Sequence, residues 1–191
     1  MREVGLRGLY GLAALAALLP VAGSAAELRS EYTDLDIAQC TMLESDELGA
    51  VWACPGLRGY PVMVAEGDLR MFVSFGLNPG AEKAAQITLP PFNRLGTKLE
   101  WLLDAADDTA PPVATILRWY TQRETGSDEG QVLVVTQLKP GAICHIAYVD
   151  ALANKNANEL ARQAAEELAG DFDCEDTMPQ AFGEFAAFDV E

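Results

Sequence analysis

The chain has 191 residues, of which 29 are acidic and 13 are basic, and its formal charge at pH 7 is −16. A field of that sign repels nucleic acid and anionic lipid surfaces, which excludes nucleic acid as a partner. It also draws cationic molecules inward at rates that fall with salt, although a strongly acidic surface equally serves solubility alone.

Residues 1–26 have the pattern of a signal peptide. Two arginines precede an apolar run over 9–21, and small residues follow it up to Ala26, which is the order of a charged region, an apolar region and a cleavage site. The apolar run is shorter than the roughly 20 residues that cross a bilayer, so no stable membrane anchor is expected after cleavage. We expect cleavage after Ala26, or after Ala25, and a periplasmic mature chain with 11 basic and 28 acidic residues, a formal charge of −17.

All four cysteines follow the predicted cleavage site. An even number of cysteines in an exported chain indicates a disulfide framework, and four cysteines allow three pairings. We favour Cys40–Cys54 and Cys144–Cys174, because each pair joins segments that are close in sequence. No CxxC motif is present, so thioredoxin-like exchange has no support. The length left after cleavage is that of a single domain, 27–191.

Strands dominate the middle of the chain. Residues 27–48 are acidic without sustained periodicity, and we interpret them as an N-terminal arm held by Cys40. The following segments alternate in polarity or are rich in β-branched and aromatic residues, and turns with glycine and proline separate them. Strands are expected at 50–54, 60–65, 69–75, 97–103, 113–121, 131–138 and 143–149. The best hairpin signal is the turn at 66–68, where Gly67 can take the positive φ that a tight turn requires.

A long loop is expected over 76–96, which contains three prolines and three glycines. Loops of that length inside a compact domain are uncommon and are often functional. Recognition of a ligand and passive connection of two strands both fit this segment.

The chain ends in a predicted helix and a tail. Alanines and leucines recur at a spacing of about 3.6 along 153–168, with charged residues largely on the opposite side. Asn156, with Glu159 three residues later, resembles a capping box, and Gly170 suits a left-handed C-terminal cap. The tail at 175–191 carries three phenylalanines at helical spacing, and we interpret it as either a short docked helix or a loosely docked, frayed end.

Together these elements predict an α+β domain. We expect an antiparallel sheet of about six or seven strands, with the C-terminal helix packed on one of its faces. Two disulfides staple this domain, and the second ties the end of the helix to the last strand. The pattern leaves the strand order open.

No catalytic constellation is visible in the sequence. His145, the single histidine, alternates onto the same face as Ile143 and Ala147, which favours a core histidine over a catalyst. The chain has no G-x-S-x-G turn for a serine hydrolase and no glycine-rich phosphate loop. The aromatic residues of the strand segments are interpreted as core, although several of them exposed on one sheet would form a ligand platform. They are Trp52, Tyr60, Trp101, Trp119, Tyr120 and Tyr148.

Metal sites have little support, and no cofactor is expected. Zinc would need more histidines and free thiolates than the chain offers. The run 171–176 begins like an EF-hand loop, but its sixth position is Asp176 instead of glycine and its twelfth is Phe182 instead of glutamate. Two further acidic clusters are more typical of solvated surface than of metal sites. They are Asp34 with Asp36, and Asp104 with Asp107 and Asp108.

Several short runs carry a resemblance to known proteins. With Cys40 upstream, they are CPG from Cys54, YPV from Tyr60, AEGDLR from Ala65, GQVLVV from Gly130 and DALAN from Asp150. Over most of its mature length the chain resembles a group of exported proteins of alphaproteobacteria that have no known activity. The resemblance implies a periplasmic location and no particular reaction.

The leading functional hypothesis is a non-catalytic periplasmic binding or interaction module. A concrete form is an inhibitor or chaperone of a cationic protein such as lysozyme, since opposite charges would speed their encounter. One alternative is a carboxylate-based hydrolase, which needs two facing acidic side chains and at least one displaced pKa. Another is a divalent-cation binder. The sequence indicates no oligomeric state.

Overall fold

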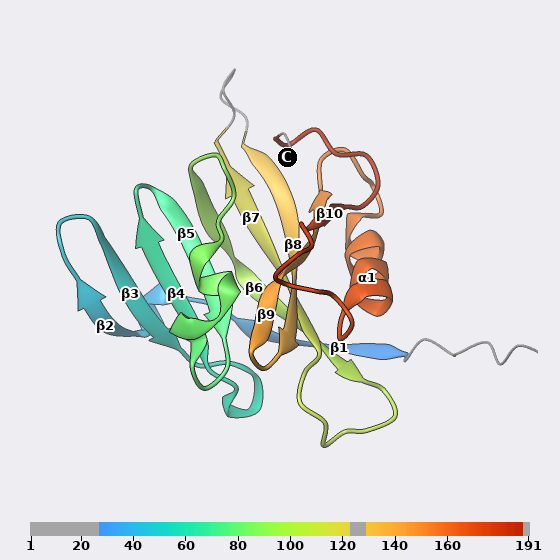
Figure 1. The fold of residues 1–191 in the computed structure, drawn as a ribbon. Coiled ribbons are helices and arrows are strands. Elements are labelled where there is room, and N and C mark those ends of the chain that lie inside the picture. Colours follow the sequence, from blue (N-terminus) through green and yellow to red (C-terminus); the bar gives the residue numbers. More distant parts are fainter. Residues whose placement is uncertain (1–26, 123–128, 189–191) are drawn as a thin grey trace, which may run out of the picture.

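The computed structural model describes residues 27–122 and 129–188, and the predicted signal peptide lies outside these ranges. In the described part the chain is mostly β, with ten strands in two sheets and one α-helix. This is broadly an α+β fold, but the strands are more numerous than expected and form two sheets instead of one. Figure 1 shows the small sheet, the large sheet and the helix as successive layers.

The large sheet has six strands in the order β1-β6-β7-β8-β9-β10, and the small sheet has four in the order β2-β3-β4-β5. Neighbouring strands are antiparallel, except β9 and β10, which run parallel. The large sheet comprises β1 Leu28–Asp34, β6 Asn93–Asp104, β7 Ala114–Thr121, β8 Gly130–Lys139, β9 Ala142–Asp150 and β10 Gln180–Ala181. The small sheet comprises β2 Thr41–Ser45, β3 Gly49–Cys54, β4 Val62–Gly67 and β5 Arg70–Phe75, and the helix α1 spans Ala157–Leu168.

Apolar side chains from the facing surfaces of the two sheets form the main core. Trp101 of β6 is fully buried there and makes edge-to-face contacts with Tyr60 and Phe75, with ring centroids 5.9 and 5.7 Å away. Its indole N–H donates to the Thr33 hydroxyl at 2.8 Å. This hydrogen bond satisfies the one polar group of the buried side chain. The main core therefore holds β1 to the sandwich as well as joining the two sheets.

The helix packs on the other face of the large sheet, as predicted. Its small side chains, among them Ala161 and Ala164, are fully buried against β8 and β9. They belong to a second apolar cluster, which we call the helix-side core. Gly170 has φ +96° and forms the left-handed cap that was expected. The capping box was wrong, because the Asn156 side chain makes no capping hydrogen bond. Within the described residues no helix has both the length and the apolar character needed to cross a membrane.

The interpretation of 27–48 as an irregular arm was wrong. This segment contains β1, which pairs with β6 at one edge of the large sheet, and β2, which forms one edge of the small sheet. Polar contacts secure β1, including a hydrogen bond from Ser30 Oγ to Glu100 Oε1 at 2.5 Å. An edge strand fixed by backbone pairing and polar side chains needs no apolar periodicity, which is why the pattern did not indicate it.

The hairpin between β4 and β5 is present, but its turn lies one residue later than predicted. Gly67 pairs with Arg70, so the two-residue loop is Asp68 and Leu69, with φ of 51° and 60°. Two consecutive positive φ values define the type I′ turn, which suits the twist of a hairpin and normally contains asparagine or glycine. Leucine is strained in this conformation because its Cβ crowds the neighbouring backbone.

Replacing Leu69 with glycine is therefore expected to stabilise the fold by about 1 kcal/mol. The Leu69 side chain is 63 % exposed, so little packing is lost with it. Urea unfolding of the purified mature chain measures the effect. Leu69→Ala is the matched control, since it removes the same exposed side chain but keeps the Cβ, and we expect it to change stability little. Equal stabilities of the glycine and alanine variants would contradict the strain argument.

The segment after β5 is a packed part of the fold. It is shorter than the predicted loop 76–96, because β6 already begins at Asn93. Two 3-10 helices lie within it, Pro79–Ala81 and Lys83–Gln86. Leu89 is fully buried in the main core, and the Glu82 carboxylate accepts backbone N–H groups at the start of β9 and in the turn before it, at 3.0 and 2.9 Å. The segment thus bridges β5 of the small sheet to β9 of the large one.

The described part of the C-terminal tail is docked in an extended form. Instead of a short helix it contains β10, which pairs with β9, and Phe182 packs against the helix-side core. Phe185 and Phe188 pack against the main core, with their rings 5.0 Å apart. The helical spacing of the phenylalanines was therefore misleading, and both docked interpretations missed the strand.

Both predicted disulfides are confirmed. Cys40–Cys54 joins the residue before β2 to the end of β3, and Cys144–Cys174 joins β9 to the segment that follows α1. No free cysteine occurs in the described residues. Paired cysteines of this kind indicate an oxidising compartment outside the cytoplasm.

Candidate functional site

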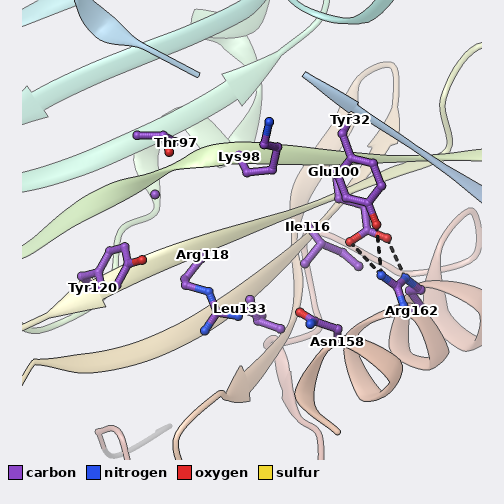
Figure 2. Close-up of a pocket in the computed structure, with 11 residues that line it drawn as sticks. Tyr32, Thr97, Lys98, Glu100, Ile116, Arg118, Tyr120, Leu133, Asn158 and Arg162 are labelled. Carbon is purple, nitrogen blue, oxygen red and sulfur yellow. Dashed lines mark hydrogen bonds and ion pairs between the residues drawn. The ribbon is translucent and has the colours of Figure 1, made fainter. Parts of the chain in front are cut away.

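A polar groove lies on the helix side of the large sheet, where α1 covers β8 and β9 but leaves β6 and part of β7 open. Its volume is about 250 Å³. We call it the sheet groove, and Figure 2 shows its residues. The polar lining consists of Tyr32, Lys98, Glu100, Arg118, Asn158 and Arg162. Ile116, Leu133 and Tyr120 supply the apolar and aromatic lining.

Strand alternation places these side chains on one face. In β7, Leu117 and Trp119 point into the main core, while Ile116, Arg118 and Tyr120 face the groove. The register shift in β6 between Leu95 and Leu99 contains Gly96, Thr97 and Lys98, which all line the groove. A glycine is required at position 96, because a Cβ there would lie 2.9 Å from the Arg118 carbonyl oxygen.

A partly buried ion pair, Arg162 with Glu100, lies in the lining of the groove. Arg162 Nε donates to Glu100 Oε1 at 2.6 Å, and its Nη2 reaches Glu100 Oε2 at 3.3 Å and the Tyr32 hydroxyl at 3.1 Å. The Glu100 side chain is only 9 % exposed. The hydrogen bond to Glu100 raises the pKa of Arg162, so the guanidinium stays charged. This pair is poorly suited to proton transfer, since the charge-assisted hydrogen bonds between the two groups favour the ionised form of each.

The remaining cations of the groove are less fully paired. Arg118 Nη1 donates to the neutral amide oxygen of Gln131 at 2.9 Å, and no carboxylate of the described residues forms a salt bridge with Arg118. Lys98 pairs with Asp34, and both side chains are mostly exposed. The lining thus carries three cations and one carboxylate in a strongly acidic protein.

A second feature is the exposed edge formed by β2 and the turn after it. Every residue from Thr41 to Leu48 is exposed, and we call this segment the β2 edge. Three of its side chains are large and apolar, with exposed fractions of 56 % for Met42, 58 % for Leu43 and 83 % for Leu48. Glu44, Asp46 and Glu47 make the same segment acidic. In the described part of the chain, β2 has a neighbouring strand on one side only.

The β2 edge is well ordered by its own turn and by a disulfide. Asp46 Oδ1 accepts the backbone N–H groups of Leu48 at 2.7 Å and Gly49 at 3.0 Å. Cys40–Cys54 fastens the other end of the β2–β3 hairpin. An edge strand with unpaired backbone groups and exposed apolar side chains is a template for another strand, and natural proteins usually blunt such edges.

A third feature is a cavity of about 590 Å³ at one end of the sandwich, which we call the end cavity. Its lining is mostly apolar and includes Leu57, Leu77, Pro111 and Pro112. Both charged residues of the lining are already engaged. Arg58 donates to Glu31 and to the Asp108 carbonyl, and Glu82 accepts the two backbone N–H groups described above.

His145 is a core residue, as the sequence favoured. It is 1 % exposed and lies between Trp119 and Tyr148, with its Nδ1 3.2 Å from the Tyr148 hydroxyl. Its Nε2 has no hydrogen-bond partner among the described residues. Burial lowers the pKa of His145 to about 4. Ala147 does not share its face, because a register shift between β8 and β9 turns it to the helix-side core.

The acidic clusters serve as turn-forming groups. Carboxylates of Asp36, Asp104, Asp107 and Asp173 each accept a backbone N–H two residues further along the chain. Across 27–122 and 129–188, no three histidine, cysteine or acidic side chains lie close enough to hold a metal ion. Among the described residues, three carboxyl groups have a displaced pKa, those of Glu31, Asp107 and Glu129, and in each case hydrogen bonds lower it. A general acid would need the opposite shift.

The aromatic residues divide between core and cavities. Trp101, Trp119 and Tyr148 are buried in the main core, as predicted. Tyr60 lines the end cavity and Tyr120 lines the sheet groove, so the described strands form no continuous aromatic platform. Sequence reasoning missed Arg118 and Arg162 altogether. The available signal was a charged residue at the centre of an otherwise apolar strand, Arg118 in β7.

No protein-family model, no curated protein and no solved structure matches the chain.

Proposed function

We propose that the chain is a non-catalytic periplasmic binding module that docks a cationic protein along the β2 edge, and that it inhibits or protects that partner. Lysozyme is the concrete partner to test. The observation that carries the proposal is the run of eight exposed residues from Thr41 to Leu48 on an unpaired edge of the small sheet. The two disulfides support a location outside the cytoplasm.

Backbone geometry supports strand addition as the mode of docking. An extended segment of a partner can continue the small sheet beyond β2, with main-chain hydrogen bonds giving affinity and side-chain contacts giving specificity. Leu43 and Leu48 supply apolar area that is otherwise left in water. The Cys40–Cys54 disulfide keeps the hairpin in its paired form, which lowers the entropy lost on docking.

Charge supports a cationic partner. Glu44 and Glu47 lie on the β2 edge and form no ion pair with any described residue, and the whole chain carries a net charge of −16. Complementary fields raise association rates and disfavour acidic competitors, and the effect falls with ionic strength.

Calorimetric titration of the mature chain with lysozyme tests the proposal. We expect a complex of micromolar affinity at about 0.01 M salt that weakens at least about tenfold at about 0.3 M salt. The Glu44→Lys/Glu47→Lys variant is expected to lose about tenfold or more at low salt. Asp46 is left unchanged, since its carboxylate holds the turn.

The matched control places the same charge change elsewhere. Glu166→Lys/Asp176→Lys alters two exposed residues on and after α1, and α1 lies on the far side of the large sheet from the small sheet that carries β2 (Figure 1). We expect this variant to lose only about twofold, through net charge alone. Equal losses in the two variants would remove the β2 edge from the proposal, and the absence of any salt-sensitive complex would overturn it.

A further inference from the structure

The sheet groove concentrates positive charge where the rest of the protein is acidic. Lys98, Arg118 and Arg162 line it against a single carboxylate, Glu100, although acidic residues outnumber basic ones by 29 to 13 in the whole chain. Glu100 is itself neutralised by Arg162. The groove therefore presents a local excess of positive charge, carried mainly by Arg118.

Arg118 is held in place without being neutralised. Its Nη1 donates to the Gln131 side chain at 2.9 Å, which fixes the guanidinium plane through an uncharged acceptor. A guanidinium presents five N–H donors in a planar fork that matches a carboxylate. Because no carboxylate of the described residues pairs with it, the fork is available to an anion that enters the groove.

The start of α1 adds to the same field. Asn158, the second residue of the helix, lines the groove, and the Asn156 side chain does not cap the first turn. N–H groups of a first helical turn have no acceptor within the helix, and the helix end carries a partial positive charge. Figure 2 shows Asn158 and Arg118 on opposite walls of the groove, with Leu133 between them.

The rest of the lining is apolar or aromatic. Ile116 and Leu133 form the floor. The Tyr120 ring is supported by Arg94, whose guanidinium carbon lies 3.9 Å from the ring centroid and which also pairs with Glu129. Arg94 is thereby engaged with Tyr120 and Glu129, and Arg118 is the lining cation that has no carboxylate partner among the described residues. The volume of about 250 Å³ is below the usual range for drug-sized ligands.

We propose that the sheet groove binds a carboxylate that carries a small apolar or aromatic group. Arg118 receives the carboxylate, the first turn of α1 and Lys98 add to the field, and the apolar group rests on Ile116 and Leu133 beside the Tyr120 ring. The carboxylate belongs either to a free small acid or to the C-terminal residue of a peptide. This site is separate from the β2 edge and does not depend on docking there.

Nuclear magnetic resonance titration of the mature chain with phenylacetate tests the site. We expect saturable shifts of the Gly96, Ile116 and Leu133 signals with a Kd below about 1 mM. Phenylacetamide, which has the same shape without the charge, is expected to bind at least about tenfold more weakly, because charge-assisted hydrogen bonds are lost. Absence of saturation at about 10 mM phenylacetate, or equal binding of the amide, would overturn the proposal.

Variants assign the binding to Arg118. Arg118→Gln keeps a polar side chain of similar length and is expected to weaken phenylacetate at least about tenfold. Lys139→Gln removes an exposed cation at the far end of β8 and is expected to leave affinity unchanged. Far-ultraviolet circular dichroism and urea unfolding establish that both variants are folded. An unchanged affinity in Arg118→Gln would overturn the role of this residue and with it the proposal.

A further titration with peptides distinguishes the two sources of the carboxylate. The tripeptide Gly-Gly-Phe with a free C-terminus is compared with its C-terminal amide and with phenylacetate. Binding of the free peptide at least about tenfold tighter than phenylacetate identifies a peptide C-terminus as the source, and weaker binding identifies a free acid. In both cases the carboxylate is required, as proposed.

Discussion

Replacing Cys144 and Cys174 together by alanine is expected to lower the free energy of unfolding by about 3.5 kcal/mol. The bond closes a loop with a sequence separation of 30, and in the chain-entropy model its removal releases that much conformational freedom in the unfolded state. For a domain of this size the melting temperature should fall by about 10 °C. Thermal and urea unfolding of the oxidised wild-type and variant chains measure both quantities.

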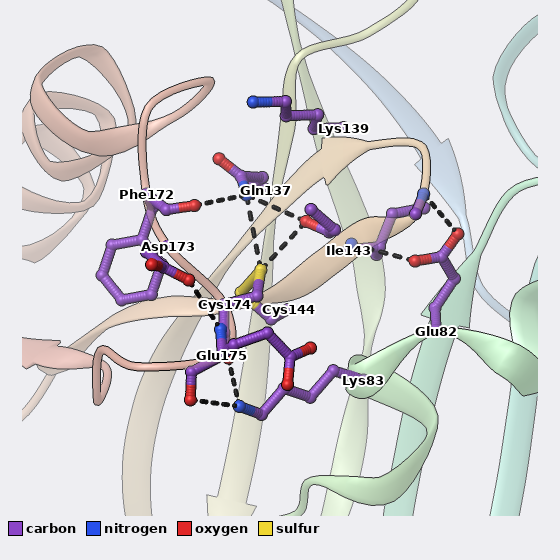
Figure 3. The surroundings of a disulfide bond; sticks show 12 residues. Glu82, Lys83, Gln137, Lys139, Ile143, Cys144, Phe172, Asp173, Cys174 and Glu175 are labelled. Atoms are coloured by element: carbon purple, nitrogen blue, oxygen red, sulfur yellow. Dashed lines mark hydrogen bonds between the residues drawn. A yellow bond between two sulfur atoms is a disulfide. The ribbon is translucent and has the colours of Figure 1, made fainter.

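Local contacts make this disulfide hard to replace. Gln137, which is fully buried, donates from Nε2 to the carbonyl oxygens of Ala142 at 2.8 Å and Phe172 at 3.1 Å, and it accepts the Gly170 N–H at 2.8 Å. Figure 3 shows the hydrogen bonds that Gln137 donates near the sulfur atoms, with Lys83 donating to the Cys174 carbonyl from the other side. The bond therefore anchors the segment after α1 to β8 and β9 at the point where several buried polar groups depend on it.

The Cys40–Cys54 bond supplies the control. It closes a shorter loop, with a sequence separation of 14, so its removal should cost about 3 kcal/mol from entropy alone. It also fastens the β2–β3 hairpin, where the sulfur of Cys40 contacts a backbone carbonyl and no buried polar side chain of the described residues bonds to either sulfur. A larger loss of stability from Cys40→Ala/Cys54→Ala than from Cys144→Ala/Cys174→Ala would contradict the account given for the second bond.

The elements that the sequence predicts correctly are those whose stability comes from a buried apolar face. Strands β8 and β9 carry nearly continuous apolar or β-branched runs because both of their faces are covered, one by the main core and the other by α1. The helix is equally predictable from the sequence, because its alanines lie on one face and pack closely against β8 and β9. In each case the residues that produce the hydrophobic pattern in the sequence are the residues that pack in the core, so the pattern predicts the element.

The missed elements are edges. All five residues of β2 are exposed, and β1 is secured by hydrogen bonds such as those of Ser30 and Thr33. Neither needs a hydrophobic period. The division into two sheets was missed for a related reason. Which strands pair depends on contacts between segments far apart in the sequence, and the local pattern of residues carries no information about those contacts. The turn at Asp68 and Leu69 was placed wrongly because glycine normally marks positive φ, and here two residues with side chains adopt it.

The candidate sites were only partly accessible from sequence. Strong acidity pointed toward a cationic partner, and the exposed acidic β2 edge supports a surface for one. The sheet groove was invisible, since Glu100 and Arg162 are 62 residues apart and Arg118 comes from a third element. Only the three-dimensional pairing of Glu100 with Arg162 leaves Arg118 as the cation without a carboxylate partner among the described residues.

Acidification from pH 7.5 to pH 5 is expected to destabilise the fold by about 2 kcal/mol through His145 alone. Burial lowers its pKa from 6.5 to about 4, so the unfolded chain takes up the proton at a higher pH than the folded chain does. The stabilisation from the neutral ring is therefore complete above pH 6.5 and is lost as the pH falls toward 4. Below pH 4 both states are protonated and the loss levels off at about 3 kcal/mol.

The variant His145→Leu isolates this contribution. It costs stability at every pH, because the Tyr148 hydroxyl loses its partner at Nδ1, but it has no ring to titrate. Urea unfolding at pH 7.5 and pH 5 should show a loss about 2 kcal/mol larger in the wild type than in the variant, since contributions of the carboxyl groups are common to both. The imidazole C–H resonance of the folded wild type should show no titration above about pH 5. Equal losses in the two proteins, or an imidazole that titrates near pH 6.5 in the folded state, would mean that His145 is hydrated and that the contact with Trp119 is loose.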